Sequence, residues 1–296
     1  MKLPTIQPGA GIGVVAPGEW VRPKDIQSAV DLLKEQGYRI YYGNHLFDQH
    51  RYFSGTVAQR VSDIHQFLYD KKVQAIYAAR GGVGSAQLLP HLDWQTWQKN
   101  KKLLIGFSDI TALQWGIWGK IGVPSISGMT LTLQLQPGNP YLSLFFKMLS
   151  GKHQQITAAE LSHEKVQVAR SGTAEGILMG GTLTIINSLL GTPYFPQFDQ
   201  PLILFLEDVK EPLYRLERLL VQLQQAGVLR QVAGLILGRF LWQEGQHSLW
   251  PIVEYLFPPD IPVIVNFPYG HFPDSCPLPV GVRARLQTDP FILSWN

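Results

Sequence analysis

The chain has 296 residues, of which 45% are hydrophobic and 16% charged, and its formal net charge is +3. This composition is typical of a soluble globular protein with a sizeable core, and the length favours about two domains. So small a charge, without long lysine or arginine runs, gives no indication of a nucleic-acid or anionic membrane partner. The single cysteine, Cys276, excludes an internal disulfide.

The N-terminal residues and the hydropathy bear on location. Pro4 and Pro8 stand where a secretory signal peptide needs an apolar core, and no apolar run approaches the roughly 18 residues that cross a bilayer. We therefore expect a cytoplasmic protein.

The first half alternates short apolar runs with amphipathic segments. In the segment 24–36, Ile26, Val30 and Leu33 share one helical face, and Gly37 stops the helix. The pattern predicts strands at 13–18, 38–42, 73–79, 103–105 and 124–129, and helices at 24–36, 57–68, 110–117 and 141–150. The β-α-β-α-β order predicts an α/β domain with a parallel sheet and helices on both faces.

The second half is richer in strands. A turn-rich, polar stretch around 135–165 is interpreted as a linker, dividing the chain into domains 1–150 and 151–296. Beyond it, strands are predicted at 165–170, 176–179, 201–206, 232–237, 261–267 and as a pair within 282–295. A short helix is predicted to open at 180–183 and to end at Gly191, and a longer one covers 212–226. We expect a smaller, strand-rich α/β domain.

Ser108 lies at a predicted strand-to-helix corner. Gly106 allows a tight turn after the apolar run 103–105, and apolar residues then recur at helical spacing from Ile110 to Ile117. The corner resembles a nucleophile elbow, but Ile110 stands where Gly-x-Ser-x-Gly has its second glycine. Alternatively, Ser108 is only a helix N-cap.

A glycine-rich loop follows another predicted strand. Residues 79–85 read Ala-Arg-Gly-Gly-Val-Gly-Ser. The glycines let backbone N–H groups approach a ligand, although the Gly-Lys-Ser/Thr ending of a phosphate loop is missing. The loop is either a tight turn or a source of oxyanion donors near Ser108, because both segments open on the same edge of the sheet.

Glu207 and His271 follow later predicted strands. A serine hydroxyl needs a base, which histidine supplies near neutral pH, and a carboxylate fixes the tautomer of that histidine. The order Ser108, Glu207, His271 is one of the known triad orders. The sequence leaves alternatives open, in which Glu207 pairs with an arginine, His271 is an ordinary loop residue, or another carboxylate is the acid. The alternative partners are Arg215 and Arg218, and the alternative acids are Asp208, Glu211 and Asp274.

No cysteine, histidine and carboxylate cluster has the spacing of a metal site. His45 and His50 are five residues apart and lack nearby partners, so we expect no zinc site. A substrate with a free carboxylate needs a cationic anchor, for which Arg80 and Arg239 are candidates; either is alternatively a structural ion-pair partner.

Several short motifs occur together in a characteristic order. They are 13–17 (Gly-Val-Val-Ala-Pro), the loop 79–85, 106–109 (Gly-Phe-Ser-Asp), 176–181 (Gly-Ile-Leu-Met-Gly-Gly), 206–208 (Leu-Glu-Asp) with 214–215 (Tyr-Arg), and 270–271 (Gly-His) with 278–281 (Leu-Pro-Val-Gly). In the residues and the order of these motifs, the chain resembles the LD-carboxypeptidases. This family of serine peptidases also includes the microcin C self-immunity proteins.

The resemblance implies a role for five residues. Ser108 matches the nucleophile, Glu207 the triad acid and His271 the general base, and the backbone N–H groups of Gly82 and Asp109 match the oxyanion hole. It also implies a Rossmann- or flavodoxin-like N-terminal domain, a smaller strand-rich C-terminal domain, a site between the two, a homodimer, and no metal or cofactor.

The implied reaction is hydrolysis of the L,D-peptide bond that releases D-alanine from murein tetrapeptides in cell-wall recycling. The sequence departs from the family at Val83, at Thr182, where an Asn is common, and at 18–20 (Gly-Glu-Trp). These departures concern the substrate pocket. We therefore keep a second hypothesis, the same mechanism on a peptidyl-nucleotide antibiotic or another amide. A third is a non-catalytic module that binds a ligand in the glycine loop.

Overall fold

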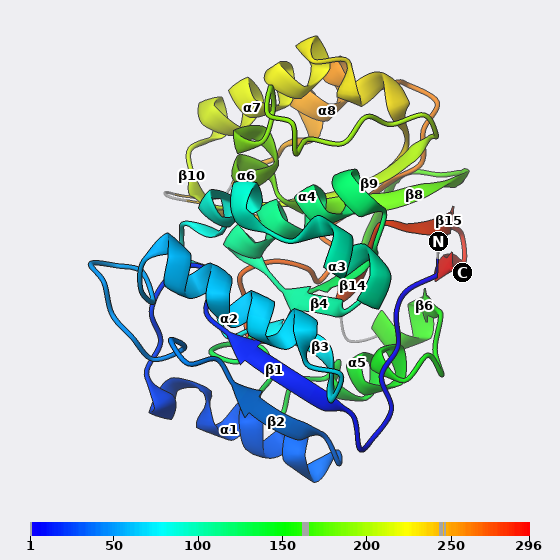
Figure 1. Cartoon of the computed structure of the whole chain (residues 1–296). Coiled ribbons are helices and arrows are strands. Elements are labelled where there is room, and N and C mark those ends of the chain that lie inside the picture. The colour runs from blue at the N-terminus through cyan, green and yellow to red at the C-terminus, as the bar shows by residue number, and fades with distance from the viewer. Residues whose placement is uncertain (1, 162–165, 243–244, 246) are drawn as a thin grey trace.

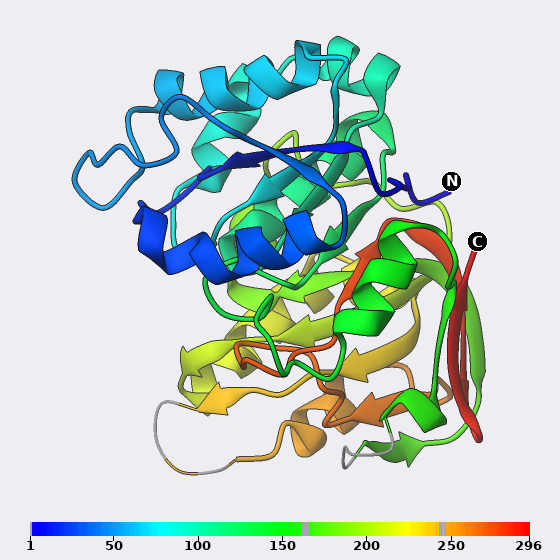
Figure 2. The same cartoon turned by 90° about the horizontal axis from the view of Figure 1, so that it is seen from below.

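The computed structural model describes residues 2–161, 166–242, 245 and 247–296. Its elements form two sheets with helices around them (Figures 1 and 2). The strands of the first sheet are β1 (Gly11–Val15), β2 (Arg39–Tyr42), β3 (Val73–Ala78), β4 (Leu103–Gly106), β5 (Ser125–Ser127) and β14 (Leu278–Val280). Those of the second are β6 (Gln155–Thr157), β7 (Gln167–Arg170), β8 (Thr173–Thr182), β9 (Leu202–Glu207), β11 (Val232–Leu237), β13 (Val263–Val265), β15 (Val282–Thr288) and β16 (Phe291–Trp295).

The helices are distributed along the whole chain, and one small strand pair stands apart from the two sheets. The α-helices are α1 (Pro23–Glu35), α2 (Val57–Tyr69), α3 (Trp94–Asn100), α4 (Thr111–Ile121), α5 (Leu142–Leu149), α6 (Leu183–Ser188), α7 (Leu213–Gln225) and α8 (Trp250–Leu256). The 3₁₀ helices are η1 (Ser85–His91), η2 (Ser108–Ile110), η3 (Ala158–Leu161) and η4 (Val228–Gln231). The strand pair is β10 (Val209–Glu211) with β12 (Leu241–Trp242).

The first sheet has the strand order β14-β5-β4-β3-β1-β2. Strands β2, β1, β3, β4 and β5 pair in parallel in that order, which is the flavodoxin-like doubly wound arrangement. Helix α1 lies on one face of this sheet and α2 on the other (Figure 1). The predicted parallel sheet with helices on both faces is therefore confirmed.

Local sequence explains these elements. Strand β4 is buried along its whole length, so residues 103–105 form a continuous apolar run instead of an alternating one. Helix α1 has Pro23 in its first turn, where no intrahelical N–H bond is lost. Helix α2 begins with a capping box, in which the Thr56 side chain accepts a hydrogen bond from the backbone N–H of Gln59.

The second sheet has the order β6-β16-β15-β8-β9-β11-β13-β7. Strands β8, β9, β11 and β13 pair in parallel, and the outer strands are antiparallel. The predicted strand-rich α/β second half is confirmed, including the terminal strand pair. Because β9, β11 and β13 are parallel, the segments that carry Glu207, Arg239 and His271 leave the sheet at the same edge.

Strand β14 comes from the second half of the chain but completes the first sheet. Residues 278–280 pair antiparallel with β5, beyond the last parallel strand. Side chains also join the halves: the indole N–H of Trp115 donates to the carbonyl oxygen of Gly180 at 2.9 Å, and that of Trp118 to Gly281 at 3.0 Å. The two proposed domains thus share a strand across a closely packed boundary.

The main differences from the predicted elements are short segments. The strand predicted at 165–170 is β7, although Lys165 lies outside the described residues. Helices α3 and α8 and strands β6, β10, β12 and β14 were not predicted, because each offers too few residues for a clear periodicity; β6 lies in the stretch interpreted as a linker. Among the described helices, none combines the length and the apolar character needed to cross a membrane.

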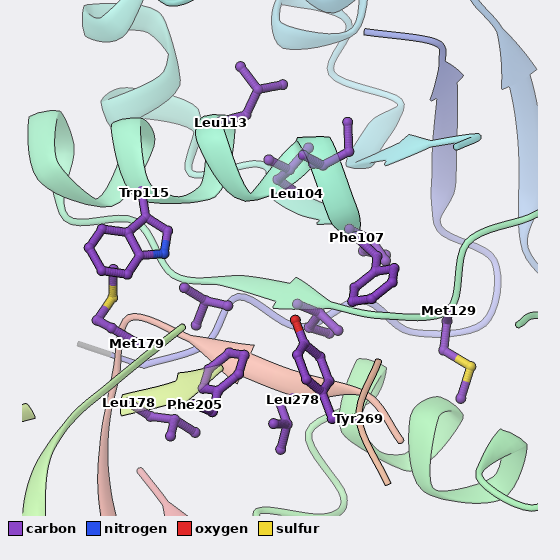
Figure 3. Close-up of a cluster of buried hydrophobic side chains, with 14 of the residues drawn as sticks. Leu104, Phe107, Leu113, Trp115, Met129, Leu178, Met179, Phe205, Tyr269 and Leu278 are labelled. Atoms are coloured by element: carbon purple, nitrogen blue, oxygen red, sulfur yellow. The ribbon is translucent and has the colours of Figure 1, made fainter. Parts of the chain in front are cut away.

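An apolar cluster fills the space between the two sheets. Figure 3 shows that it draws on both halves of the chain, with Phe107 and Trp115 from the first and Phe205 and Tyr269 from the second. All four side chains are at most 1% exposed. This cluster lies directly under the segments that carry Ser108 and His271, and so provides a rigid base for them.

Candidate active site

Ser108 occupies a strained corner between β4 and α4. Its φ is +65°, a left-handed conformation that costs a non-glycine residue free energy. A Cβ on Gly106 would lie 2.6 Å from Cγ2 of Ile110, so the tight approach after β4 requires glycine. The N-cap positions of η2 and α4 are Phe107 and Ile110, so the N-cap interpretation of Ser108 does not hold. The close packing around Gly106 and Gly81 imposes the left-handed conformation of Ser108 and holds the hydroxyl at the corner.

The structure brings Ser108, His271 and Glu207 into one hydrogen-bonded line. The Ser108 Oγ lies 2.9 Å from Nε2 of His271, and Nδ1 of His271 lies 2.7 Å from Oε2 of Glu207. Ser108 follows β4 of the first sheet, His271 follows β13 of the second, and Glu207 is the last residue of β9, so the line crosses from one sheet to the other. The carboxylate accepts a hydrogen bond from the Nδ1–H group of His271, which leaves Nε2 unprotonated and able to accept the proton of the serine hydroxyl.

The competing carboxylates have other partners. Asp208 accepts hydrogen bonds from the backbone N–H and the hydroxyl of Thr184 at 2.8 and 2.6 Å. Glu211 pairs with Arg215 at 3.1 Å. Asp274 lies 3.5 Å from Arg239. Glu207 is therefore the carboxylate that contacts His271, and Arg215 is not its partner.

The electrostatics of His271 follow from its surroundings. Burial by itself lowers the pKa of the imidazole, but the charge of Glu207, its hydrogen bond and the charge of Asp208 outweigh burial, so the pKa of His271 is raised. Burial also raises the pKa of Asp208 to about 6. The His271 ring lies 4.6 Å from the Phe107 ring, which limits its orientation.

The glycine loop packs against the corner. A Cβ on Gly81 would lie 2.6 Å from Cβ of Ser108 and 3.1 Å from the backbone nitrogen of Asp109. The loop is tied down because the backbone N–H of Ser85 donates to the Asp109 carboxylate at 2.8 Å. Gly82 has φ +89°, so its peptide adopts a turn that favours glycine. The two expected oxyanion donors, the N–H groups of Gly82 and Asp109, thus belong to segments in contact around Ser108.

Both candidate anchors for a carboxylate take part in ion pairs. Arg80 lies 2.9 Å from Glu19, one of the residues that depart from the family pattern. Arg239 lies 3.5 Å from Asp274, and its guanidinium stands over the ring of Phe272 at 5.5 Å. A substrate carboxylate at either arginine would have to join or displace the acidic partner.

Residues that sequence reasoning missed support the site from outside. Arg60, buried in α2, donates to the carbonyl oxygens of Pro17 and Gly84 at 2.6 and 3.1 Å. It therefore fixes the loop after β1 to the glycine loop. Thr182 donates to the other oxygen of Glu207 at 2.5 Å. The sequence marked Thr182 only as a departure from the family pattern. Its contact with Glu207 depends on strand register, because Thr182 lies opposite Glu207 where β8 pairs with β9.

The described part of the chain, which omits residues 1, 162–165, 243–244 and 246, contains no candidate metal site. Within that described part, no group of three or more His, Cys, Asp or Glu side chains is placed to hold a metal ion.

Comparison with known domains identifies the family. Residues 12–128 match the LD-carboxypeptidase N-terminal domain, and residues 175–286 match the LD-carboxypeptidase C-terminal domain. The chain belongs to the LD-carboxypeptidase family. It is therefore an enzyme, a serine-type LD-carboxypeptidase, and the hypothesis of a non-catalytic module is wrong.

Relatives and solved structures agree with this assignment. The murein tetrapeptide carboxypeptidase of Pseudomonas aeruginosa is 33% identical over an alignment of 299 positions, gaps included. The alignment covers 96% of this chain and 95% of the relative. The microcin C7 self-immunity protein MccF of Escherichia coli is 28% identical over 290 residues, 88% of this chain and 84% of MccF. The muramoyltetrapeptide carboxypeptidase of Oxalobacter formigenes has the same fold, with a TM-score of 0.84, 29% identity and coverage of 97% of this chain and 99% of that chain.

Proposed function

We propose that this LD-carboxypeptidase releases the terminal D-alanine of murein tetrapeptides by hydrolysing the L,D-peptide bond, as a step in cell-wall recycling. The observation that carries the proposal is the unbroken line from Ser108 through His271 to Glu207, at 2.9 and 2.7 Å. The substrate is supported by the Pseudomonas aeruginosa relative, whose own name states that it acts on murein tetrapeptide.

Acylation follows from the geometry of that line. The Ser108 Oγ attacks the carbonyl carbon that precedes D-alanine, while Nε2 of His271 takes the hydroxyl proton. Glu207 stabilises the imidazolium that forms. The backbone N–H groups of Gly82 and Asp109 are the proposed donors to the oxyanion, and such a donor typically contributes about 10²–10³ in turnover. The proton on Nε2 then passes to the amine of the leaving D-alanine as the peptide bond breaks.

Deacylation reverses the roles. Water enters where D-alanine has left and gives a proton to Nε2 of His271 as its oxygen attacks the ester carbonyl. The ester bond to Ser108 breaks, the serine oxygen regains its proton, and the tripeptide leaves. Arg80 and Arg239 are the proposed anchors for substrate carboxylates, each in competition with its acidic partner.

The test compares the wild type with Ser108→Ala on a murein tetrapeptide, followed by mass spectrometry. We expect the wild type to remove one D-alanine and the variant to lose about 10⁴-fold or more in turnover. An unchanged rate in Ser108→Ala would show that another residue is the nucleophile. If the wild type does not cleave the tetrapeptide, murein tetrapeptide is excluded as the substrate, and the roles of Ser108, His271 and Glu207 have to be tested on another amide.

A second candidate substrate is a peptidyl-nucleotide antibiotic, cleaved by the same line of residues. It is favoured by the 28% identity with MccF over most of both chains and by the departure at Glu19, which pairs with Arg80 beside the glycine loop. Competition between the tetrapeptide and an aminoacyl-nucleotide in one reaction ranks the two by their kcat/KM values.

The cellular setting is proposed on the family resemblance. We infer a cytoplasmic homodimer. Sedimentation equilibrium of the purified chain tests the dimer, and fractionation of the source cells tests the location.

A further inference from the structure

The second oxygen of the Glu207 carboxylate makes a contact outside the line to Ser108. Its Oε2 faces His271, and its Oε1 accepts a hydrogen bond from the hydroxyl of Thr182 at 2.5 Å. Glu207 has no exposed surface, and Thr182 is 4% exposed. A buried carboxylate oxygen that loses its donor cannot turn to bulk water instead, so this hydrogen bond is costly to remove.

Thr182 is itself held from two sides. The parallel register of β8 and β9 places it opposite Glu207. Its backbone N–H donates to Oγ1 of Thr111 at 3.3 Å, and Thr111 begins α4, directly after the turn that carries Ser108. A Cβ on Gly181 would lie 2.5 Å from that same Oγ1, so the close approach of β8 to α4 depends on glycine.

These contacts close a ring. Ser108 bonds to His271, His271 to Glu207, Glu207 to Thr182, and Thr182 to Thr111, whose helix follows Ser108. The ring crosses between the two sheets twice, once through His271 and once through Thr182. Since the terminal torsion of a glutamate is broad, one hydrogen bond to His271 does not by itself fix the carboxylate plane. Bonds to both oxygens do.

We propose that Thr182 is a positioning residue for the triad acid, which keeps Oε2 of Glu207 on Nδ1 of His271. This inference rests on the proposed roles of Ser108, Glu207 and His271. It also changes the meaning of the Asn-to-Thr departure at residue 182, because the hydroxyl is directed at the acid and not at a substrate.

The chain supplies a matched control two residues away. The Thr184 hydroxyl donates to Asp208 at 2.6 Å, a bond of nearly the same length between the same two chemical groups. Asp208 has no hydrogen bond to His271 in the described contacts. Thr182→Val and Thr184→Val thus remove equivalent hydroxyls with the same change of shape, but only Thr182 donates to the carboxylate that contacts His271.

The experiment measures the rate at which a small fluorophosphonate labels Ser108 across pH, together with kcat and KM for the tetrapeptide. We expect Thr182→Val to lower the labelling rate and kcat about tenfold or more, the effect of one hydrogen bond to a charged group. KM should stay within about twofold of the wild-type value, because the substitution removes no contact with the bound substrate. Thr182→Ser should restore the rate.

The pH profile separates positioning from packing. Without the Thr182 hydroxyl, Oε2 of Glu207 is no longer held on Nδ1 of His271. The hydrogen bond and charge that raise the pKa of His271 then act less strongly, so this pKa falls and the acid limb moves to lower pH. Thr184→Val should keep the wild-type rate within about twofold at pH values above the acid limb, because Asp208 acts on His271 only through its charge and the bond between Glu207 and His271 stays intact.

Three outcomes overturn the proposal: an unchanged rate and limb in Thr182→Val, an equal loss in Thr184→Val, or a raised KM with normal labelling, which would indicate a substrate contact. If Thr182→Val does not fold by circular dichroism, Thr182→Ala provides the same readouts. Because labelling needs no peptide, a wild type that reacts with the probe but leaves the tetrapeptide intact refutes the proposed substrate and still tests Thr182.

Discussion

At the residue scale, the proposed mechanism depends on the protonation state of His271. The imidazole must be neutral at Nε2 to accept the serine proton, and its pKa is raised because the charge of Glu207, its hydrogen bond and Asp208 together outweigh burial. As the pH falls through that raised pKa, the base is protonated and the rate is lost. The acid limb of kcat/KM should therefore lie above the ordinary histidine value of about 6.5.

Glu207→Gln tests this account. The substitution removes the Glu207 charge and leaves burial opposed mainly by the charge of Asp208, so the pKa of His271 falls and the acid limb should move to lower pH, while kcat drops by about 10³–10⁴. The measurement is kcat/KM against pH for both proteins. An acid limb at the same pH in both would mean that Glu207 does not set the pKa of His271.

At the element scale, the glycine loop depends on helix α2. Arg60 is 2% exposed and reaches from that helix to the carbonyl oxygens of Pro17, in the loop after β1, and of Gly84, in the glycine loop. It also donates to the side chain of Gln87 at 2.8 Å. Its guanidinium lies over the Phe53 ring at 4.5 Å. The loop that supplies a proposed oxyanion donor is thus positioned by a buried side chain outside the site.

Arg60→Met should destabilise the protein by about 3 kcal/mol, because it leaves buried carbonyl oxygens without donors. We also expect a lower kcat, since the loop is no longer fixed. Urea denaturation gives the first quantity. Arg285→Met is the control, because Arg285 pairs with Glu175 at 3.6 Å on the surface and should matter by less than about 0.5 kcal/mol. Equal losses in both variants would contradict the role assigned to Arg60.

At the scale of the whole molecule, the two sheets depend on each other. The first sheet takes its edge strand β14 from residues 278–280, and the proposed base and acid, His271 and Glu207, come from segments of the second sheet. The apolar cluster of Figure 3 is shared by both halves. Neither half carries a complete site, and the first half lacks a strand of its own sheet.

Residues 1–150 expressed alone should therefore fold poorly. The fragment leaves the edge of β5 unpaired and exposes Trp115 and Phe107, which the second half covers. Size-exclusion chromatography and circular dichroism should show aggregation or loss of structure, and co-expression with residues 151–296 should recover soluble protein. A monomeric, cooperatively folded fragment would show that the first half is independent.

The sequence by itself determined the features that depend on short stretches of chain. The alternation of strands and helices in the first half follows from periodicity, and the corner at Ser108 follows from the apolar run 103–105, Gly106 and the helical spacing after them. The ordered motifs indicated the family. These features need no knowledge of distant partners, because propensity and hydrophobic pattern act over a few residues.

Only the tertiary structure decided which distant groups meet. Ser108 and His271 are 163 positions apart, and the sequence left Asp208, Glu211 and Asp274 as rivals of Glu207. The strand at 278–280 was missed because three residues carry too little pattern, and its place depends on the free edge of β5. The contact of Thr182 with Glu207 depends on the register of β8 against β9. Register and strand order result from packing the whole chain, so local sequence does not specify them.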